Sequence, residues 1–204
     1  MTNHATGDTV ADVVNRPPLG VVLVAVAVIA LGEASGAVIG AVRPAVARWA
    51  AARIAARPQA HGLTGSAEYD DEVRDRAVFA TEAGLSFLHT HAEGLGLVAF
   101  FATTLVASVV GRRRVRAVLY ALLVAGALFP VGYLVYALAV LQWGRETGIE
   151  LAETWVLTPL GTAAIVGLLG LACLMWGAPT WPPTPPNRSE APRRSRGAPR
   201  SPDA

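Results

Sequence analysis

Long apolar stretches alternate with short polar ones along the chain, and this pattern predicts four membrane-spanning helices. A helix needs roughly 20 mostly apolar residues to cross a hydrocarbon core about 30 Å thick. Segments of that length occupy residues 19–42, 81–110, 117–143 and 154–176. The third contains Pro130 near its middle, where we expect a kink because proline removes a backbone hydrogen bond. The sequence therefore predicts an all-α, polytopic integral membrane protein, a small bundle of four transmembrane helices.

Three further segments complete the predicted organisation. Residues 1–18 form a polar N-terminal segment, whose length and single arginine do not match a cleaved signal peptide. Residues 43–80 are expected to form a loop, which is poor in apolar residues after Pro58 and too short to bury a core of its own. Residues 177–204 are rich in proline and arginine, so we expect a disordered tail.

Composition narrows the class of protein. The chain is 53% hydrophobic and 16% charged, whereas soluble domains carry about 25% charged residues. The only cysteine, Cys173, lies in an apolar run, which excludes a disulfide scaffold. A net charge of +2 is too small to indicate nucleic-acid binding. No phosphate loop or nucleophile elbow is present, so an autonomous enzyme is not expected. The expected partners are the lipid bilayer and either further copies of the chain or a larger membrane complex.

Arginines predict the orientation of the chain, because short cytoplasmic loops carry the excess of positive charge. Residues 111–116 hold four arginines and no acid, and the tail adds five more. Residues 144–153 hold one arginine against three glutamates. We therefore expect a bacterial inner (plasma) membrane protein with both termini cytoplasmic and residues 43–80 extracytoplasmic. Four arginines between residues 43 and 57 disagree with this orientation.

Ionisable side chains mark the beginning of the second span. Such groups at membrane depth cost several kcal/mol unless they are paired, ligated or hydrated, so each is a candidate functional residue. On a helical wheel His89 and Glu93 lie within about 20° of Glu82, whereas His91 lies at about 180°. One side of the helix therefore presents a polar stripe, and the other presents a single histidine. The first span contributes one further acid, Glu33.

Several interpretations of these residues remain open. They are interfacial polar groups that cap the helix and dock neighbouring segments, or Glu33 pairs with His89 or His91 across helices. Such a pair would also relay protons. A metal site is the third interpretation, because His89 and Glu93 at positions i and i+4 can face one ion, and Glu82 or Glu33 would complete a set of nitrogen and oxygen ligands. Glu82 lies about 10 Å from His89 along the helix axis, so without a bend the third ligand would have to be Glu33 or His61.

Two further patterns carry structural expectations. Gly32, Gly36 and Gly40 recur every four residues, which is the spacing that lets two membrane helices approach closely. General richness in glycine and alanine is the other explanation of this spacing. His4 and His61 are isolated in the sequence, and we expect both to be solvated.

The run Leu-His-Thr-His-Ala-Glu-Gly-Leu-Gly at residues 88–96 resembles the start of helix two in the haem-copper oxidase superfamily. It is most similar to the branch that includes the nitric oxide reductases, where a His-Thr-Asn run carries a haem ligand. The resemblance implies that His89 is an axial ligand of haem b, that Thr90 matches the threonine and that His91 replaces the asparagine.

The resemblance also has a limit, because spans three and four contain no histidine for a second ligand or for copper. It therefore implies a small haem-binding or redox-accessory protein with His89 and His91 as the cofactor-binding residues. The rival class is a structural or regulatory membrane protein without a cofactor.

Overall fold

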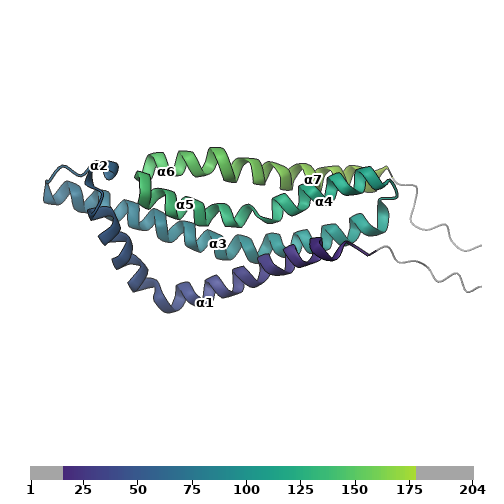
Figure 1. Cartoon of the computed structure of the whole chain (residues 1–204), viewed down its shortest axis with the longest axis horizontal. Coiled ribbons are helices and arrows are strands. Elements are labelled where there is room, and N and C mark those ends of the chain that lie inside the picture. The colour runs from purple at the N-terminus through teal and green to yellow at the C-terminus, as the bar shows by residue number, and fades with distance from the viewer. Residues whose placement is uncertain (1–15, 178–204) are drawn as a thin grey trace, which may run out of the picture.

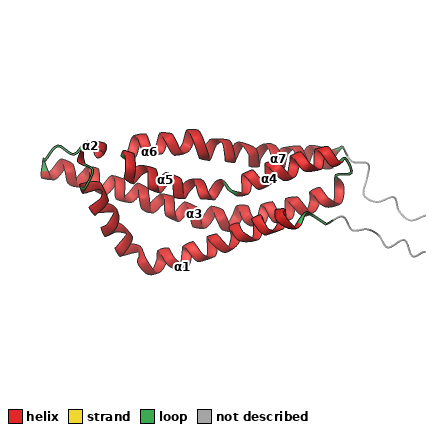
Figure 2. Ribbon diagram, in the orientation of Figure 1, coloured by secondary structure: helices red, strands yellow, loops and turns green. Residues whose placement is uncertain are grey.

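The computed structural model describes residues 16–177, and every element in that range is helical (Figures 1 and 2). The predicted tail, apart from Gly177, and the predicted polar segment up to residue 15 lie outside the described residues. The elements are α1 (Leu19–Ala55), α2 (Pro58–His61), α3 (Ala67–Val109), α4 (Arg113–Ala127), α5 (Phe129–Trp143), α6 (Arg145–Ala152), the π-helix η1 (Glu153–Leu157) and α7 (Thr158–Trp176).

Four stretches are long and apolar enough to cross a membrane, which confirms the predicted fold class. They are α1, α3, α4 with α5, and the continuous run from α6 through η1 to α7. Only 17% of the most apolar window of the first and last stretches is buried inside the protein. Large side chains such as Phe101 and Ile165 point outward, with 65% and 60% of their surface exposed. A soluble protein rarely exposes so much apolar surface. The surface is consistent with contact to the lipid acyl chains of a membrane.

The segment expected as a loop at residues 43–80 is mostly helical. α1 continues to Ala55 and α3 already begins at Ala67, so the connection is confined to α2 and the residues around it. The expectation was wrong because the segment does not need a core of its own: its apolar residues pack against the end of α5. The buried cluster there comprises Ala50, Ile54, Ala77, Ala80, Val140 and Leu141.

The first and second spanning helices are much longer than a membrane requires. α1 has 37 residues and α3 has 43, which correspond to about 55 and 65 Å of helix. The hydrocarbon core is about 30 Å thick, so both helices extend beyond it. Figure 1 shows α3 reaching past α5 and α6, and α1 bending back toward α3. Pro44 lies inside α1, and proline is the usual cause of a sharp kink.

The third span is interrupted where the sequence predicts. α4 ends at Ala127, Leu128 forms a turn, and α5 begins at Phe129 with Pro130 in its first turn. Figure 2 shows this break as a short loop between the two helices. The expected kink at Pro130 is confirmed.

The two described ends of the chain lie at the same end of the bundle. Figure 1 places the start of α1, the end of α7 and the turn between α3 and α4 together, and it places α2 and the α5–α6 turn at the opposite end. The first and last spans therefore begin and end on one side, as an even number of spans requires. Which side of the membrane this is stays a prediction from the arginines.

Candidate functional site

The polar stripe of α3 lies against α1, and we call this contact the α1–α3 seam, defined by Arg43, Glu82, His89, Glu93 and the glycines of α1 opposite them. At one end of the seam, Arg43 Nη2 lies 3.1 Å from Glu82 Oε2. The guanidinium thus neutralises the carboxylate. Arg43 was expected in a loop, but the continuation of α1 brings it to this position.

His89 is the central residue of the seam. Its Nδ1 donates a hydrogen bond of 2.9 Å to the carbonyl oxygen of Gly32 on α1. The same nitrogen lies 3.1 Å from Oε1 of Glu93, one turn further along α3. His89 therefore connects a backbone carbonyl on one helix to a carboxyl group on the other.

A glycine on α1 makes room for the imidazole. A Cβ atom built on Gly36 would lie 2.6 Å from Nδ1 and 2.8 Å from Nε2 of His89, which is closer than non-bonded atoms come. At Gly40 the same added atom would meet nothing within 4 Å. The two helices therefore approach closely at Gly32 and Gly36, whereas Gly40 faces open space.

His91 lies on a different side of α3, as the helical wheel predicts. Its Nδ1 donates to the carbonyl oxygen of Phe87 in the same helix at 3.0 Å. Its ring faces an aromatic group that includes residues of α5, with ring centroids 5.0 Å from Tyr133 and 5.8 Å from Phe129. The two histidines thus have separate environments and do not face one ligand.

Glu33 does not make the expected pair with His89 or His91. Its side chain is exposed, and within residues 16–177 it takes part in no ion pair or hydrogen bond. The prediction was wrong by one residue: Gly32 faces α3, and Glu33 is turned about 100° away from it. The backbone carbonyl of Gly32, and not a carboxylate, is the partner of His89 on α1.

The four candidate metal ligands are not assembled. Glu82 is held by Arg43, and Glu33 points away, so only His89 and Glu93 are in contact. Across the part of the chain that the structure describes, no three His, Cys, Asp or Glu side chains are grouped so that they could hold a metal ion. The predicted set of Glu33, Glu82, His89 and Glu93 therefore does not form one site.

A second polar site lies at the end of the bundle where α2 closes the α1–α3 hairpin. His61 of α2 is buried, with only 7% of its surface exposed, although we expected it to be solvated. Its Nε2 donates to the carbonyl oxygen of Leu141 in α5 at 3.3 Å. Nδ1 is also buried and has no hydrogen-bond partner in residues 16–177. Burial lowers the pKa of His61, and the positive charge of Arg57 lowers it further.

Backbone contacts fix α2 to the turn between α5 and α6. Gly144 adopts φ +86°, a conformation that other residues rarely adopt. A Cβ atom at this position would also collide with the carbonyl oxygen of Ala60. Arg57 Nη1 donates to the carbonyl oxygen of Gln142 at 3.3 Å. Together with the bond from His61, these contacts hold α2 against the end of α5.

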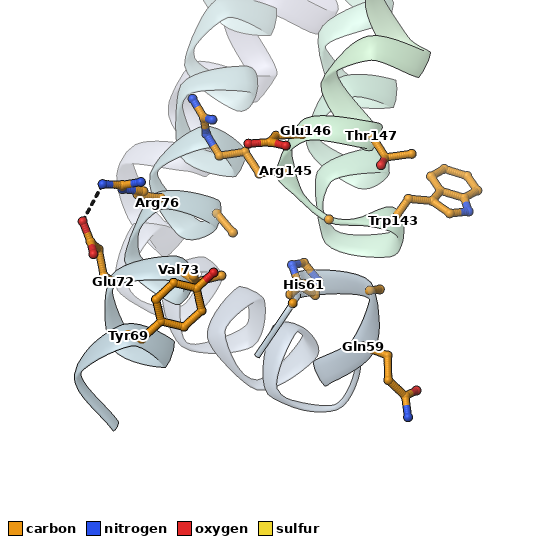
Figure 3. A pocket seen from close by; sticks show the side chains of 14 residues that line it. Gln59, His61, Tyr69, Glu72, Val73, Arg76, Trp143, Arg145, Glu146 and Thr147 are labelled. Atoms are coloured by element: carbon orange, nitrogen blue, oxygen red, sulfur yellow. Dashed lines mark hydrogen bonds and ion pairs between the residues drawn. The ribbon is translucent and has the colours of Figure 1, made fainter. Parts of the chain in front are cut away.

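A pocket of about 460 Å³ opens between α2, α3 and the α5–α6 turn, and we call it the α2 pocket. Figure 3 shows His61 and Gln59 on one side of it, Tyr69 to Arg76 of α3 on a second side, and Trp143 to Thr147 on the third. Its polar and charged lining comprises Gln59, His61, Tyr69, Glu72, Arg76, Arg145, Glu146 and Thr147. Pro58 and Gly62 indicate a short helical turn in the sequence, but no local pattern shows that this turn docks on α5.

The fold and these two sites define a multi-pass helical membrane protein with a polar seam between its first two spans. A comparison with models of known protein families, with curated proteins and with solved structures finds no match to this chain. Its function must therefore be inferred from its own residues.

Proposed function

We propose that this chain is a structural or regulatory protein of a bacterial inner membrane, in which the polar residues of α3 dock helices. The observation that carries the proposal is the position of His89 Nδ1, which donates to the carbonyl oxygen of Gly32 and lies beside Glu93. The imidazole is thereby used to hold α1 against α3. The arginine-rich turn shares one end of the bundle with both described ends of the chain, which supports the proposal that both termini are cytoplasmic.

The energetics of membrane helices favour this role. Lipid tails are as apolar as the helix surfaces, so helices associate through close packing and interhelical hydrogen bonds. The seam supplies both, because Gly36 admits the ring of His89 and Gly32 accepts its hydrogen bond. Bonds of this kind contribute about 0.6 kcal/mol on average and up to about 1.7 kcal/mol. Glu82 adds an ion pair with Arg43 near the bend of α1.

Replacing His89 tests the proposal. We expect His89→Ala to lower the free energy of unfolding by about 1–2 kcal/mol, measured by titrating the purified protein with SDS and following its helicity. The matched control is His91→Ala, because His91 bonds only to its own helix and contacts α5. A cysteine pair across α1 and α3 should lose cross-linking in the first variant and keep it in the second. Equal behaviour of both variants would contradict the docking role.

One observation favours a second candidate function, haem binding. An axial histidine usually donates its Nδ1–H to a carbonyl or carboxylate, which leaves Nε2 to bind iron. His89 makes such a bond with Nδ1, so its Nε2 is the nitrogen that would hold haem b in a redox-accessory protein. The close packing of the ring against Gly36 weighs against this candidate, because a bound porphyrin would require the seam to open.

An absorption spectrum separates the two functions. The full chain, purified in detergent from cells supplied with excess haem, should show no Soret band if the seam only docks helices. A Soret band that His89→Ala abolishes and His91→Ala merely shifts would establish haem binding and replace the first proposal.

A further inference from the structure

The α2 pocket lies apart from the α1–α3 seam and has the chemistry of a ligand site. It is formed by α2, the first turns of α3 and the α5–α6 turn, which is distant from the other two in sequence. Its volume of about 460 Å³ falls in the range of small-molecule sites, which is about 300–1,000 Å³. Most of its side chains are polar or charged, whereas the spanning helices around the seam expose apolar surface (Figure 3).

The N-terminus of a long helix forms one wall of the pocket. The first backbone hydrogen bond there runs from the amide of Gly148 to the carbonyl oxygen of Gly144, 2.9 Å long. Within the described residues no side chain caps this end, so the amides of residues 145–147 have no intrahelical acceptor. The helix continues through η1 and α7 to Trp176, and its dipole places partial positive charge at this end.

Two arginines line the pocket, and one of them is unpaired among the described residues. Arg76 of α3 is paired with Glu72 one turn earlier. Arg145 begins α6 and makes no ion pair with any residue between 16 and 177. A guanidinium presents several N–H donors in a plane and is suited to carboxylate and phosphate groups. The pocket therefore offers free amides and, once the side chain of Arg145 turns toward them, a free guanidinium to one ligand.

His61 is an independent sign that the pocket is incomplete without a ligand. More than nine-tenths of this side chain is buried, it lines the pocket, and its Nδ1 has no partner in the described chain. Figure 3 shows its ring rising from α2 toward the turn between Trp143 and Arg145. Buried polar atoms are nearly always hydrogen-bonded. Because Nε2 carries the proton that Leu141 accepts, Nδ1 of the neutral ring is an acceptor, and only the protonated ring can donate from Nδ1 to an anion. A protonated His61 would become a further donor.

We propose that the α2 pocket binds an oxyanion, a phosphate or carboxylate group, at the N-terminus of α6. Arg145 and the amides of residues 145–147 contact the anion. Protonation of His61 accompanies binding, because a bound anion stabilises the imidazolium. Of the two acids that line the pocket, Glu72 is paired with Arg76 and Glu146 opposes binding. The anion is either a free solute or the headgroup of an anionic lipid, which share this chemistry.

The test uses the full chain in nanodiscs of phosphatidylcholine and inorganic phosphate as the probe. Isothermal titration should detect saturable binding at pH 6. Arg145→Ala should weaken it about tenfold or more, because a charge-assisted hydrogen bond is lost. Glu146→Gln should tighten binding. The matched control is Arg114→Ala at the opposite end of the bundle, which should change nothing. Thermal unfolding of each variant confirms that it is folded.

A second arm distinguishes the source of the anion. Nanodiscs that contain phosphatidic acid replace added phosphate, and protection of the α2 region from hydrogen exchange is measured. Protection with phosphatidic acid but no heat with phosphate assigns the site to a lipid headgroup, whereas the reverse assigns it to a free anion. No response to either probe overturns the proposal, and so does equal loss of binding in Arg145→Ala and Arg114→Ala.

The pH dependence of binding tests whether His61 takes up a proton when the anion binds. Binding to the native chain should tighten as the pH falls from 8 to 6, by up to about tenfold for each pH unit over which His61 takes up its proton. His61→Gln keeps a donor for the carbonyl of Leu141 and does not titrate, so only the protonation of phosphate itself should change its affinity with pH. An unchanged pH dependence in this variant removes His61 from the site.

Discussion

At the residue scale, the α1–α3 seam depends on a missing side chain. Gly36 lies directly under the ring of His89, so that any Cβ atom there would displace the imidazole from the carbonyl of Gly32. Gly40, one turn later in the same helix, faces open space. Two glycines that look equivalent in the sequence therefore differ in whether they could be replaced: there is no room for a side chain at Gly36, and there is room at Gly40.

Substituting these two glycines tests this difference. Gly36→Ala should lower the free energy of unfolding by about 1–2 kcal/mol, because the ring must move and its hydrogen bond weakens. Gly40→Ala should be neutral or stabilising by up to about 1 kcal/mol, since alanine is the better helix former. The measurement is SDS-induced unfolding followed by circular dichroism. If Gly40→Ala costs as much as Gly36→Ala, the imidazole of His89 does not pack on Gly36 as described.

At the scale of the element, α2 is a single turn that is held in place by its neighbours rather than by its own length. A helix of four residues is not stable alone. It is fixed by His61 on Leu141 and by Arg57 on Gln142, with Gly144 in close contact with Ala60. Because burial lowers the pKa of His61, the docked turn favours the neutral imidazole.

The docking of α2 should therefore weaken in acid. A lowered pKa means that the stabilisation is complete above about pH 6.5, the ordinary pKa of histidine, and is lost as the pH falls toward the pKa of the docked state. Without added anion, the equilibrium between docked and undocked α2 should shift toward the undocked form by up to about tenfold per pH unit in that window.

Spin labels on cysteines introduced at Gln59 and Thr147, with Cys173 replaced by serine, report this opening as a longer distance. The matched control is His61→Gln, which should show no change between pH 8 and 5. Phosphate should reverse the acid-induced opening of the native chain if the α2 pocket binds an oxyanion. A response to pH that persists in His61→Gln would show that another group controls α2.

At the scale of the whole molecule, the bundle is asymmetric along the membrane normal. α1 and α3 extend beyond α5 and α6 at the end that carries α2 (Figure 1). The opposite end carries four arginines between α3 and the first turn of α4. The positive charges oppose translocation of that end, so the α2 end is expected outside the cytoplasm.

Topology can be measured directly. A cysteine at Asp71, near the start of α3, should react with a membrane-impermeant maleimide in intact cells, whereas a cysteine at Arg112 should react only after permeabilisation. Cys173 is replaced by serine in both. The reverse pattern would show that the four arginines between residues 43 and 57 set the orientation instead.

The fold followed from the sequence because a membrane imposes one simple condition. Each span needs enough consecutive apolar residues, and this is a local property that can be counted along the chain. The break at Pro130 is local for the same reason. The expected loop at residues 43–80 was wrong because helix formation there depends on packing against Val140 and Leu141, about 60 residues or more away in the chain.

For the candidate sites too, one part of the geometry could be predicted from the sequence and another part could not. Helical periodicity determined from the sequence alone that His89 and Glu93 share a side of α3 and that His91 does not, because the angle between residues of one helix is fixed. Only the tertiary structure decided what lies opposite them. It placed the carbonyl of Gly32, and not Glu33, against His89, and it buried His61 in a pocket whose walls come from three separate parts of the chain. Contacts between helices depend on their rotation and crossing, and no local pattern of residues encodes these.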